Sequence, residues 1–538
     1  MMNVSERLTR HARIIKDVDL RALFARDPKR GERLWLAFDN WRVDYSRHAV
    51  TDETLELLNQ YAQTLDLNHW ISALFSGERL NFTENRAALH TALRQPNDTP
   101  IMVDDKNIVE EIHAVKTTMR KFSEAIRIGL WKGATGKPFK TIVHIGTGGS
   151  YLGTRLICDA LFQKGNMDVR FVANLDHHAL DRALTGVDPE STLLVIASKT
   201  FTTEDILVNA KEACNRLAAA VRDVARVHSH HVIAVTANIK AAQDFGIPDK
   251  HILPIWPFIG GRFSLWSAVS ISLALQSGYP VFEELLSGAH AMDEHVFNTP
   301  IEQNIAVQLA LLDWWNSTFL ARRERVLVPY AHTLGFLPEH VQQLMMESNG
   351  KRIDWYGKKL SANAPSTRPI FGGVGTTSQH TFFQWLHQGM HNAMLELIVP
   401  IAVNGHAQRI EMPAHALAQA ESLMNGSDHL FAATYEPSSE ETLRAARVCV
   451  GNTPSTVFLL PNLNAYHLGA LLALYEHRTF IESILYRVNP FDQFGVELGK
   501  NLAPILKSAM MGQIKLDEED TDSATLTAVD FVKKYWKG

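Results

Sequence analysis

The sequence predicts an α/β protein with two doubly wound, mainly parallel sheets, each flanked by helices, and with a helical arm at its C-terminal end. Two observations support this fold class. Short runs typical of buried strands alternate with helix-length segments in two separate stretches of the chain, which is the pattern of parallel strands joined by crossover helices. A helical segment at residues 302–323 separates the two stretches, so we expect two sheet domains bridged by helices.

The first series lies in residues 106–278, which are predicted to form the smaller sheet domain. Its expected strands are residues 141–145, 169–173, 192–197, 231–237 and 251–255. The second series lies in residues 279–500, with expected strands at residues 325–330, 395–403 and 456–463 and a long helix over 466–486. Residues 1–105 are expected to form helices and loops that pack on the larger domain. Residues 501–538 are expected to form the arm, which is suited to wrapping around a second subunit.

The composition is that of an ordinary soluble globular protein, and it excludes several classes of function. Of the 538 residues, 46% are hydrophobic and 21% are charged, with a net charge of −5. This balance argues against a nucleic-acid-binding surface. No run approaches the roughly 18 to 20 apolar residues that cross a membrane, and the first residues lack the apolar core of a signal peptide. We therefore expect a cytoplasmic protein.

Cysteine and histidine spacing predicts neither a disulfide framework nor a metal centre. Cys158, Cys214 and Cys449 are odd in number, far apart and set in helical patterns, which indicates free, buried thiols. His387 and His391 stand four apart on an expected helix, so both imidazoles would share one face. No third ligand and no HExxH motif accompany them, and we expect no metal.

A glycine-rich turn, GTGGSYLGT at residues 146–154, follows the first expected strand. Its glycines allow a ligand to approach the backbone, and a helix that opens near Ser150 offers free N–H groups and a positive dipole end. Tyr151 occupies the position where a dinucleotide-binding GxGxxG motif needs its third glycine, and the end of a Walker A loop is missing. Taken alone, the turn fits an anion cradle and a tight strand-to-helix connection equally well.

A second polar cluster, SKTFTT at residues 198–203, follows the strand at residues 192–197. Its hydroxyls and loop N–H groups are suited to binding a phosphate dianion, although a helix cap with ordinary turn residues is the alternative. Ligands of open α/β sheets bind at the carboxyl ends of strands, so two such clusters in one series favour a phosphorylated small molecule.

Arg262 follows two glycines in the segment GGRFS, shortly before an expected helix that opens near Ser264. This arrangement places a guanidinium beside a backbone that a ligand can approach closely. A surface arginine after a tight turn is the alternative.

The second series contains two candidate acid–base groups. Pro338 near the start of a helix and Gly350 as its stop place Glu347 in the last turn. The negative end of the helix dipole there disfavours the ionised carboxylate, which suits a general base. Ser378 is expected to cap a further helix, with His380 in its first turn, where the dipole favours a neutral imidazole. Taken singly, either residue is more often an ordinary surface group.

The segment YRVNPFDQFGVELGK at residues 486–500 brings Gln493, Glu497 and Lys500 together after a turn. Gln493 is able to hydrogen-bond a polyol, and Lys500 is able to serve a sugar ring oxygen. A solvated amphipathic helix is the alternative.

In this order, six motifs closely resemble those of the glucose-6-phosphate isomerase family, also called phosphoglucose isomerase. They are GTGGSYLGT, SKTFTT, GGRFSLWSAV, MESNGK, GTTSQHTFFQWLHQG and NPFDQFGVELGK. The resemblance implies two sugar-isomerase (SIS) domains, both α/β sandwiches, in a cytosolic homodimer with active sites at the subunit boundary. It also implies isomerisation of glucose 6-phosphate and fructose 6-phosphate without a metal or another cofactor, while the composition already argues against nucleic acid or a membrane as a partner.

The resemblance assigns roles to individual residues of this sequence. The implied phosphate cradle comprises Gly149, Ser150, Ser198, Lys199, Thr200 and Thr203. The implied catalytic residues are Glu347 as the base, His380 from the neighbouring subunit as the ring-opening group, Lys500 beside it, and Arg262. Gln343 and Gln493 complete the implied substrate-binding set.

Two other functions remain open at this point. A non-catalytic sugar-phosphate sensor on the same fold would keep the hydroxyl cradle and would not need Glu347. A nicotinamide-dependent oxidoreductase would use Asp176 after its strand, but the interrupted GxGxxG motif argues against it.

Overall fold

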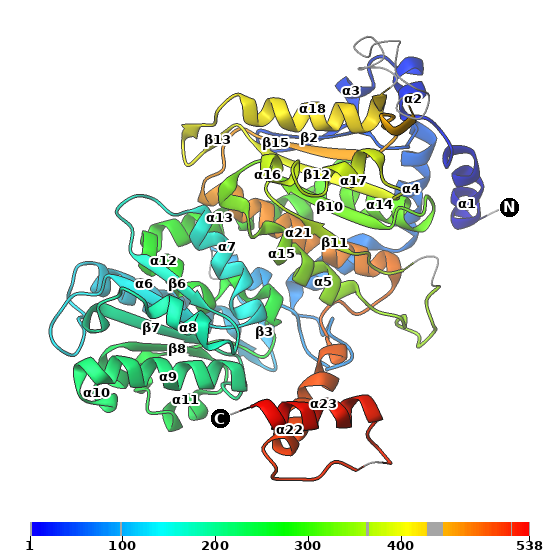
Figure 1. Cartoon of the computed structure of the whole chain (residues 1–538). Coiled ribbons are helices and arrows are strands. Elements are labelled where there is room, and N and C mark those ends of the chain that lie inside the picture. The colour runs from blue at the N-terminus through cyan, green and yellow to red at the C-terminus, as the bar shows by residue number, and fades with distance from the viewer. Residues whose placement is uncertain (1–2, 97–98, 362–364, 428–444, 518, 537–538) are drawn as a thin grey trace. The chain divides into compact units, whose positions relative to one another are not determined.

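The computed structural model describes residues 3–96, 99–361, 365–427, 445–517 and 519–536. The chain divides into two compact units, Met1–Pro490 and Phe491–Gly538. The first unit contains two major sheets, one drawn mainly in cyan and green and the other mainly in yellow, orange and blue (Figure 1). The predicted fold class, two mainly parallel sheets flanked by helices, is confirmed.

The first major sheet has five parallel strands in the order β6-β5-β7-β8-β9. The strands are β5 (Thr141–Ile145), β6 (Asp168–Val172), β7 (Thr192–Ala197), β8 (Val232–Thr236) and β9 (Ile252–Pro254). β5 and β7 are buried along their whole length, as expected for a parallel sheet that is covered on both faces. All five predicted strands are present: β5 and β7 have the predicted ends, and the ends of the other three differ by one residue.

Helices cover both faces of this sheet. One face packs against α8 (His177–Leu184), α9 (Glu204–Val221), α10 (Val224–His230) and α11 (Ile239–Asp244). The other face carries α6 (Ile108–Arg127), α7 (Leu152–Ala160) and α12 (Ile271–Ser277). In Figure 1 the sheet lies between α9 to α11 on one side and α6 and α12 on the other.

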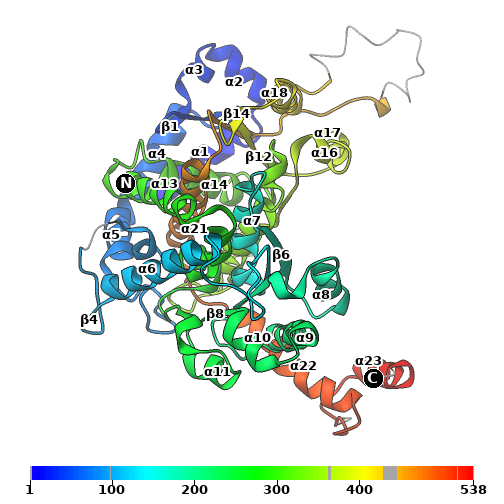
Figure 2. The same ribbon diagram turned by 90° about the vertical axis from the view of Figure 1, so that its left-hand side faces the viewer.

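The second major sheet has six strands in the order β1-β2-β15-β12-β10-β11. Its parallel part consists of β10 (Glu324–Pro329), β11 (Ile370–Gly372), β12 (Ala393–Pro400) and β15 (Ser455–Leu460). One face packs against α17 (Phe383–Gln388) and α18 (Glu411–Asn425). Figure 2 shows β12 between α16 and α17 on one side and α14 and α21 on the other.

The N-terminal segment corrects the prediction of helices and loops for residues 1–105. β1 (Trp35–Phe38) and β2 (Trp41–Arg47) form an antiparallel hairpin, and β2 pairs with β15 to extend the second sheet. Trp41 and Val43 on β2 are buried while Arg42 between them is exposed, which is the alternation of a strand that faces a core. The pairing partner lies at the other end of the chain, so no local pattern indicates the pairing.

Two long helices cross closely on the side of the second sheet opposite α17 and α18 (Figure 2). α13 (Tyr279–Asn298) and α21 (Ala465–Tyr486) approach so near that a Cβ on Gly288 would lie 1.8 Å from the carbonyl oxygen of Tyr466, and one on Gly469 would lie 1.9 Å from that of Leu285. Only glycine permits this separation. α14 (Ile305–Thr318) packs beside α21 and is buried on nearly every side.

The first unit also contains further helices and two short hairpins. At the N-terminal end lie α1 (Val4–Ile15), α2 (Leu20–Arg26), α3 (Arg30–Arg33), α4 (Asp52–Thr64) and α5 (Leu67–Ser76). Two further hairpins are formed by β3 (Met102–Val103) with β4 (Lys106–Asn107), and by β13 (Ala402–Val403) with β14 (His406–Ala407). Among the described residues, no helix is long and apolar enough to cross a membrane.

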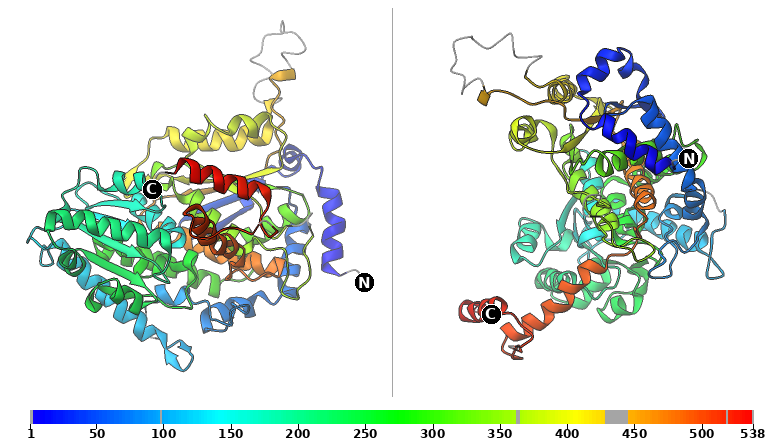
Figure 3. Two further views of the ribbon diagram at one scale, coloured as in Figure 1. Left: turned by 60° about the horizontal axis from the view of Figure 1, so that its bottom comes forward. Right: turned by 90° about the vertical axis from the view of Figure 1, so that its right-hand side faces the viewer.

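The second unit contains two helices that pack together, α22 (Glu497–Met510) and α23 (Ser523–Tyr535), drawn in red in Figure 3. Both expose large apolar side chains, among them Leu498, Leu502 and Ile505 on α22 and Phe531 on α23. The C-terminal segment is thus helical, as expected for the arm.

All three cysteines are free, as predicted. Cys158 on α7 and Cys214 on α9 are buried, and burial raises the pKa of both thiols. Cys449 is half-buried and lies outside any helix or strand, which corrects the helical position expected for it.

Candidate active site

The two polar clusters predicted from the sequence follow neighbouring strands of the first sheet and lie side by side at its edge. β5 and β7 are neighbouring parallel strands, so the turns after Ile145 and Ala197 meet at the same edge. The chain goes from β5 to β6 on one side and then crosses back to β7 on the other. This reversal of strand order at the carboxyl edge is the place where open α/β sheets bind ligands.

The glycine turn is held against the segment that carries Arg262. Residues Gly148–Ser150 form a single 3-10 turn that packs on the 3-10 helix Gly261–Trp266. A Cβ on Gly149 would lie 2.1 Å from both the carbonyl carbon and the oxygen of Gly261. Gly148 has a φ of +55°, a conformation that glycine adopts readily. The conformation of the turn therefore favours glycine at position 148, and the close contact with Gly261 requires it at position 149.

The SKTFTT turn uses two of its predicted ligand groups internally. The Oγ of Ser198, which is buried, accepts a hydrogen bond of 3.1 Å from the N–H of Phe201. The Nζ of Lys199 donates to the carbonyl oxygens of Pro257 at 3.2 Å and Ile259 at 2.8 Å, and burial lowers the pKa of this ammonium. Lys199 thus ties the turn to the segment before Arg262.

The outer hydroxyls of the same turn are accessible. Thr200 and Thr202 are exposed and hydrogen-bond each other at 2.9 Å. Thr203 is half-buried at the N-cap position of α9, and its side chain makes no capping hydrogen bond. A hydroxyl at the open end of an 18-residue helix is suitably placed to bind an anion together with the helix N–H groups.

Arg262 and Glu347 form an ion pair, with 3.5 Å between Nη1 and Oε1. Two further contacts orient the buried guanidinium. Its Nε donates to Ser348 Oγ at 2.6 Å, and its Nη2 donates to the carbonyl oxygen of Pro490. Sequence reasoning missed Ser348 and Pro490, although Ser348 directly follows Glu347 in the MESNGK motif.

Glu347 ends a π-helical segment, Gln342–Glu347, that continues α15 (Leu337–Val341). Pro338 lies in the first turn of α15 and the helical run stops before Gly350, so both predicted boundaries are confirmed. π-helical turns are rare and often mark functional sites. The Nε2 of Gln343 would lie 3.1 Å from a Cβ on Gly148, so this segment also borders the glycine turn.

A buried ionic cluster contacts the π-helical segment through Met345. Arg325 contacts the carboxylates of Asp313 and Glu482, and its Nη1 lies 2.7 Å from the Sδ of Met345 in the π-helical segment. Burial raises the pKa of Glu482 to about 7. Paired charges of this kind hold their neighbours in defined positions, because any shift leaves a buried charge without its partner.

The structure corrects the predicted surroundings of His380. Ser378 is the last residue of α16 (Gly375–Ser378) and not a helix N-cap, so His380 follows that short helix and precedes α17. Its side chain is exposed. Within the described chain no hydrogen bond or ion pair joins His380 to Glu347, and the resemblance expects this histidine to come from a neighbouring subunit.

Gln493 and Lys500 belong to the second unit. Gln493 is half-buried and precedes a 3-10 turn, and Lys500 is exposed in the first turn of α22. Of the predicted residues, the structure thus brings together those of the two turns, Arg262, Gln343 and Glu347, all within the first unit.

The histidines predicted to share one helix face do not do so. α17 ends at Gln388, and His391 lies beyond it with its Nε2 bonded to the carbonyl oxygen of Leu386. Among the described residues, the side chains of Asp176, His177 and His178 form the one group close enough to hold a metal, and all three are exposed.

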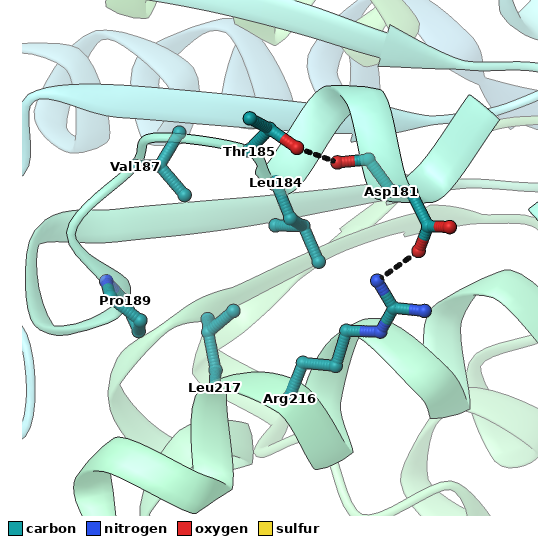
Figure 4. Close-up of a pocket in the computed structure, with 7 residues that line it drawn as sticks. All are labelled: Asp181, Leu184, Thr185, Val187, Pro189, Arg216 and Leu217. Carbon is teal, nitrogen blue, oxygen red and sulfur yellow. Dashed lines mark hydrogen bonds and ion pairs between the residues drawn. The ribbon is translucent and has the colours of Figure 1, made fainter. Parts of the chain in front are cut away.

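A cavity of about 330 Å³ lies elsewhere in the same domain (Figure 4). Leu184, Val187, Pro189 and Leu217 form its apolar wall, and Arg216 pairs with Asp181 at 2.5 Å. Pro189 precedes β7, so the cavity lies at the amino ends of the strands, opposite the two turns. It is not part of the candidate active site.

Fold and site together define a class: an α/β protein with two parallel sheets, in which a glycine turn and an arginine from the first sheet meet a glutamate-bearing segment from the second. The sequence model of the family described as phosphoglucose isomerase matches residues 44–527. This protein belongs to the phosphoglucose isomerase family.

Individual relatives agree with this assignment. Glucose-6-phosphate isomerase 1 of Chromobacterium violaceum is 40% identical, with 96% of each chain covered. Glucose-6-phosphate isomerase of Campylobacter jejuni subsp. doylei is 38% identical over 97% of this chain and 96% of its own. The crystal structure of a glucose-6-phosphate isomerase from Chlamydia trachomatis superposes with a TM-score of 0.83 at 28% identity, covering 98% of both chains.

Proposed function

We propose that this protein catalyses the reversible isomerisation of D-glucose 6-phosphate and D-fructose 6-phosphate, a step of glycolysis and gluconeogenesis. The observation that carries the proposal is the Glu347–Arg262 pair beside the glycine turn, in a chain whose relatives are named for this activity. The pair supplies a carboxylate able to move a proton and a cation able to stabilise an enediolate.

The phosphate of the substrate is assigned to the two neighbouring turns. Gly149 and Ser150 lie in the first turn, and Ser198, Lys199, Thr200 and Thr203 lie in the second. The accessible hydroxyls of Thr200 and Thr203 are the direct phosphate ligands in this proposal, together with N–H groups at the start of α9. Lys199 and Ser198 hold the turn in shape through the contacts described above.

Glu347 is assigned the role of general base. It takes the proton from C2 of the open-chain sugar, which gives a cis-enediol intermediate, and then returns it to C1 while the hydroxyl proton passes from O2 to O1. Arg262 stabilises the negative charge that develops on O1 and O2, and Gln343 binds the sugar between the glycine turn and Glu347. Hydrogen moves as a proton between adjacent carbons, so the reaction requires no metal or nicotinamide.

Ring opening is assigned to His380, with Lys500 and Gln493 at the ring oxygen and hydroxyls. In this proposal His380 comes from the second subunit of a homodimer. Its exposed position outside the Glu347 site supports this arrangement. The exposed apolar side chains of α22 and α23 provide a surface for such an association.

One labelling experiment tests the activity. The protein is incubated with fructose 6-phosphate in heavy water without added cofactor, and the glucose 6-phosphate formed is analysed for deuterium at C2. We expect label at C2, because the proton on Glu347 exchanges with solvent. Tight binding without label would indicate a sugar-phosphate sensor, and a requirement for nicotinamide would indicate an oxidoreductase.

A mixing experiment tests the shared site. Glu347→Gln and His380→Asn variants, each with little activity, are dissociated and re-formed together. If each site uses residues of two chains, mixed dimers contain one site with both native residues, and activity returns. Absence of activity after verified subunit exchange would show that a single chain supplies both residues.

A cytoplasmic location belongs to the same proposal. Both substrates carry a phosphate dianion, and such charged metabolites stay in the compartment where they are made unless a transporter moves them.

A further inference from the structure

His144 is a polar residue in a strand that is otherwise suited to apolar side chains. It lies in β5 between Val143 and Ile145, and its side chain is fully buried. Burying an imidazole is unfavourable unless hydrogen bonds compensate for its lost hydration. A buried histidine at this position therefore indicates a specific hydrogen-bonding role.

Both ring nitrogens of His144 have partners from separate elements. Nε2 lies 2.8 Å from the carbonyl oxygen of Ser150 in the glycine turn, and Nδ1 lies 2.8 Å from the Oγ of Ser272 in α12. A carbonyl oxygen only accepts, so the proton is on Nε2, and Nδ1 accepts from the Ser272 hydroxyl. Burial lowers the pKa of His144 to about 4, so this neutral tautomer persists at neutral pH.

The bond to Ser150 fixes the main chain of the glycine turn. Ser150 is the last residue of the 3-10 turn, and its N–H bonds to the carbonyl oxygen of Thr147 at 3.1 Å. A Cβ on Gly146 would lie 2.6 Å from the Ser150 oxygen and 3.2 Å from His144 Nε2. Gly146 is thus glycine because the imidazole and this carbonyl occupy the space beside it.

The same turn supports the catalytic segment. Gly149, next to Ser150, contacts the backbone of Gly261 and Arg262. A shift of the Ser150 carbonyl would therefore displace the residues assigned to phosphate and loosen the support of Arg262. His144 joins β5, the glycine turn and α12 into one rigid unit.

We propose that His144 is a positioning residue that holds the glycine turn in its phosphate-binding conformation through the Ser150 carbonyl. This inference rests on the proposed function of that turn. It predicts that His144 affects binding of the phosphate more than the chemistry of proton transfer.

A set of variants separates the two hydrogen bonds. In His144→Gln the amide nitrogen takes the place of Nε2, so a donor to Ser150 remains. In His144→Asn the amide oxygen takes the place of Nδ1, so the bond to Ser272 remains and that to Ser150 is lost. Val143→Ala, in the same buried strand, is the matched control for loss of stability without loss of either bond.

The measurements are KM for fructose 6-phosphate, kcat, and the inhibition constant of inorganic phosphate as a competitor. For His144→Asn we expect KM and the phosphate inhibition constant to rise together by about 5- to 30-fold, which corresponds to the loss of about 1–2 kcal/mol of hydrogen bonding. The change in kcat should be smaller. His144→Gln should stay within about three-fold of the native protein on both constants, since a donor remains. Val143→Ala should lower the melting temperature and leave both constants unchanged.

Two results would overturn the inference. One is a folded His144→Asn protein with unchanged KM and phosphate inhibition. The other is an equal rise of both constants in Val143→Ala, since loss of stability alone would then explain the effect. If His144→Asn does not fold, Ser272→Ala tests the same chain of contacts. In this variant we expect a smaller rise of KM and of the phosphate inhibition constant, and no rise in a folded Ser272→Ala protein would count against the inference. If the native protein had no isomerase activity, the proposed function would be overturned. Calorimetric titration of the native protein and the His144 variants with inorganic phosphate would still decide whether His144 positions the turn.

Discussion

The carboxylate of Glu347 lies 3.5 Å from the guanidinium of Arg262, although the two residues come from different sheets of the first unit. Arg262 follows the last strand of the first sheet, and Glu347 ends a π-helical segment that follows β10 of the second. Neither sheet alone contains both groups. The pairing is thus a product of the way the two sheets pack together, and it underlies the predictions for this site.

Replacing Glu347 with Gln should reduce kcat by at least about 10²- to 10⁴-fold, the usual contribution of a positioned base. An amide is isosteric with the carboxylate but does not accept the C2 proton. Binding should survive, so inorganic phosphate should still compete in a displacement assay. Glu339→Gln is the matched control, since Glu339 is exposed on the preceding helix α15. Near-native turnover of Glu347→Gln would remove this residue from the proposed role.

Replacing Arg262 with Lys should lower kcat by about 10- to 100-fold, because an ammonium does not reproduce the planar fork that reaches Ser348, Pro490 and Glu347 at once. Steady-state kinetics with fructose 6-phosphate measures the effect. Arg216→Lys, which alters the Asp181 pair beside the cavity of Figure 4, should leave kcat unchanged. Equal activities of the two variants would show that Arg262 acts only as a positive charge.

Removing the hydroxyl of Ser348 should have a smaller effect of the same kind. Ser348→Ala loses the acceptor of Arg262 Nε and keeps the carbonyl of Pro490. We expect kcat to fall by about 5- to 10-fold, less than the full value of one charge-assisted hydrogen bond, because the remaining contacts still orient the guanidinium. If Ser348→Ala is more damaging than Arg262→Lys, the serine must have a role beyond orienting the guanidinium.

Replacing Gly149 with Ala should destabilise the protein and raise KM. The new methyl group would lie 2.1 Å from the Gly261 backbone, and overpacking of this kind costs about 1–3 kcal/mol. Urea unfolding and KM for fructose 6-phosphate are the measurements. Gly31→Ala is the control, because a Cβ there meets no atom within 4 Å. Full stability and unchanged KM in Gly149→Ala would disprove the contact between the glycine turn and the Gly261–Trp266 segment.

The buried His340 should make stability depend on pH. Burial lowers the pKa of His340 to about 4 from its ordinary value of 6.5. Between these values the unfolded chain binds the proton and the folded chain does not, so this histidine reduces stability as pH falls from 6.5 to about 4. In His340→Leu the free energy of unfolding should therefore vary with pH less steeply, by up to about 1.4 kcal/mol per pH unit.

Comparison of variant and native protein isolates this effect. Glu476 and Glu482, whose pKa burial raises to about 7, titrate with the opposite sign and are the same in both proteins. Chemical unfolding at a series of pH values measures the difference. Parallel stability curves for the two proteins would show that His340 does not titrate on unfolding.

Much of the first sheet and of the site was predictable from local patterns. The strand at residues 192–197 has the predicted ends, and Glu347 occupies the predicted last helical turn. Periodicity and glycine positions act over a few residues, so a sequence window contains the information they need. The domain boundaries and the roles of the site residues stay predictions.

Other features depended on contacts between distant segments. The strand β2 joins the second sheet by pairing with β15. The prediction of helices and loops for this segment was wrong because the partner strand lies far along the chain. The position of His380 was also mispredicted, since the helix expected after Ser378 in fact ends there. Lys199 turned out to bind two carbonyl oxygens, which no spacing rule indicates.

The sequence by itself determined the alternation of strands and helices, the two polar turns at strand ends, and the family to which the chain belongs. These follow from residue types within short stretches. Only the tertiary structure decided that Arg262 faces Glu347, that Gly149 packs on Gly261, and that His144 fixes the Ser150 carbonyl. Such contacts arise when segments far apart in the chain are buried together and each buried polar group must find a partner.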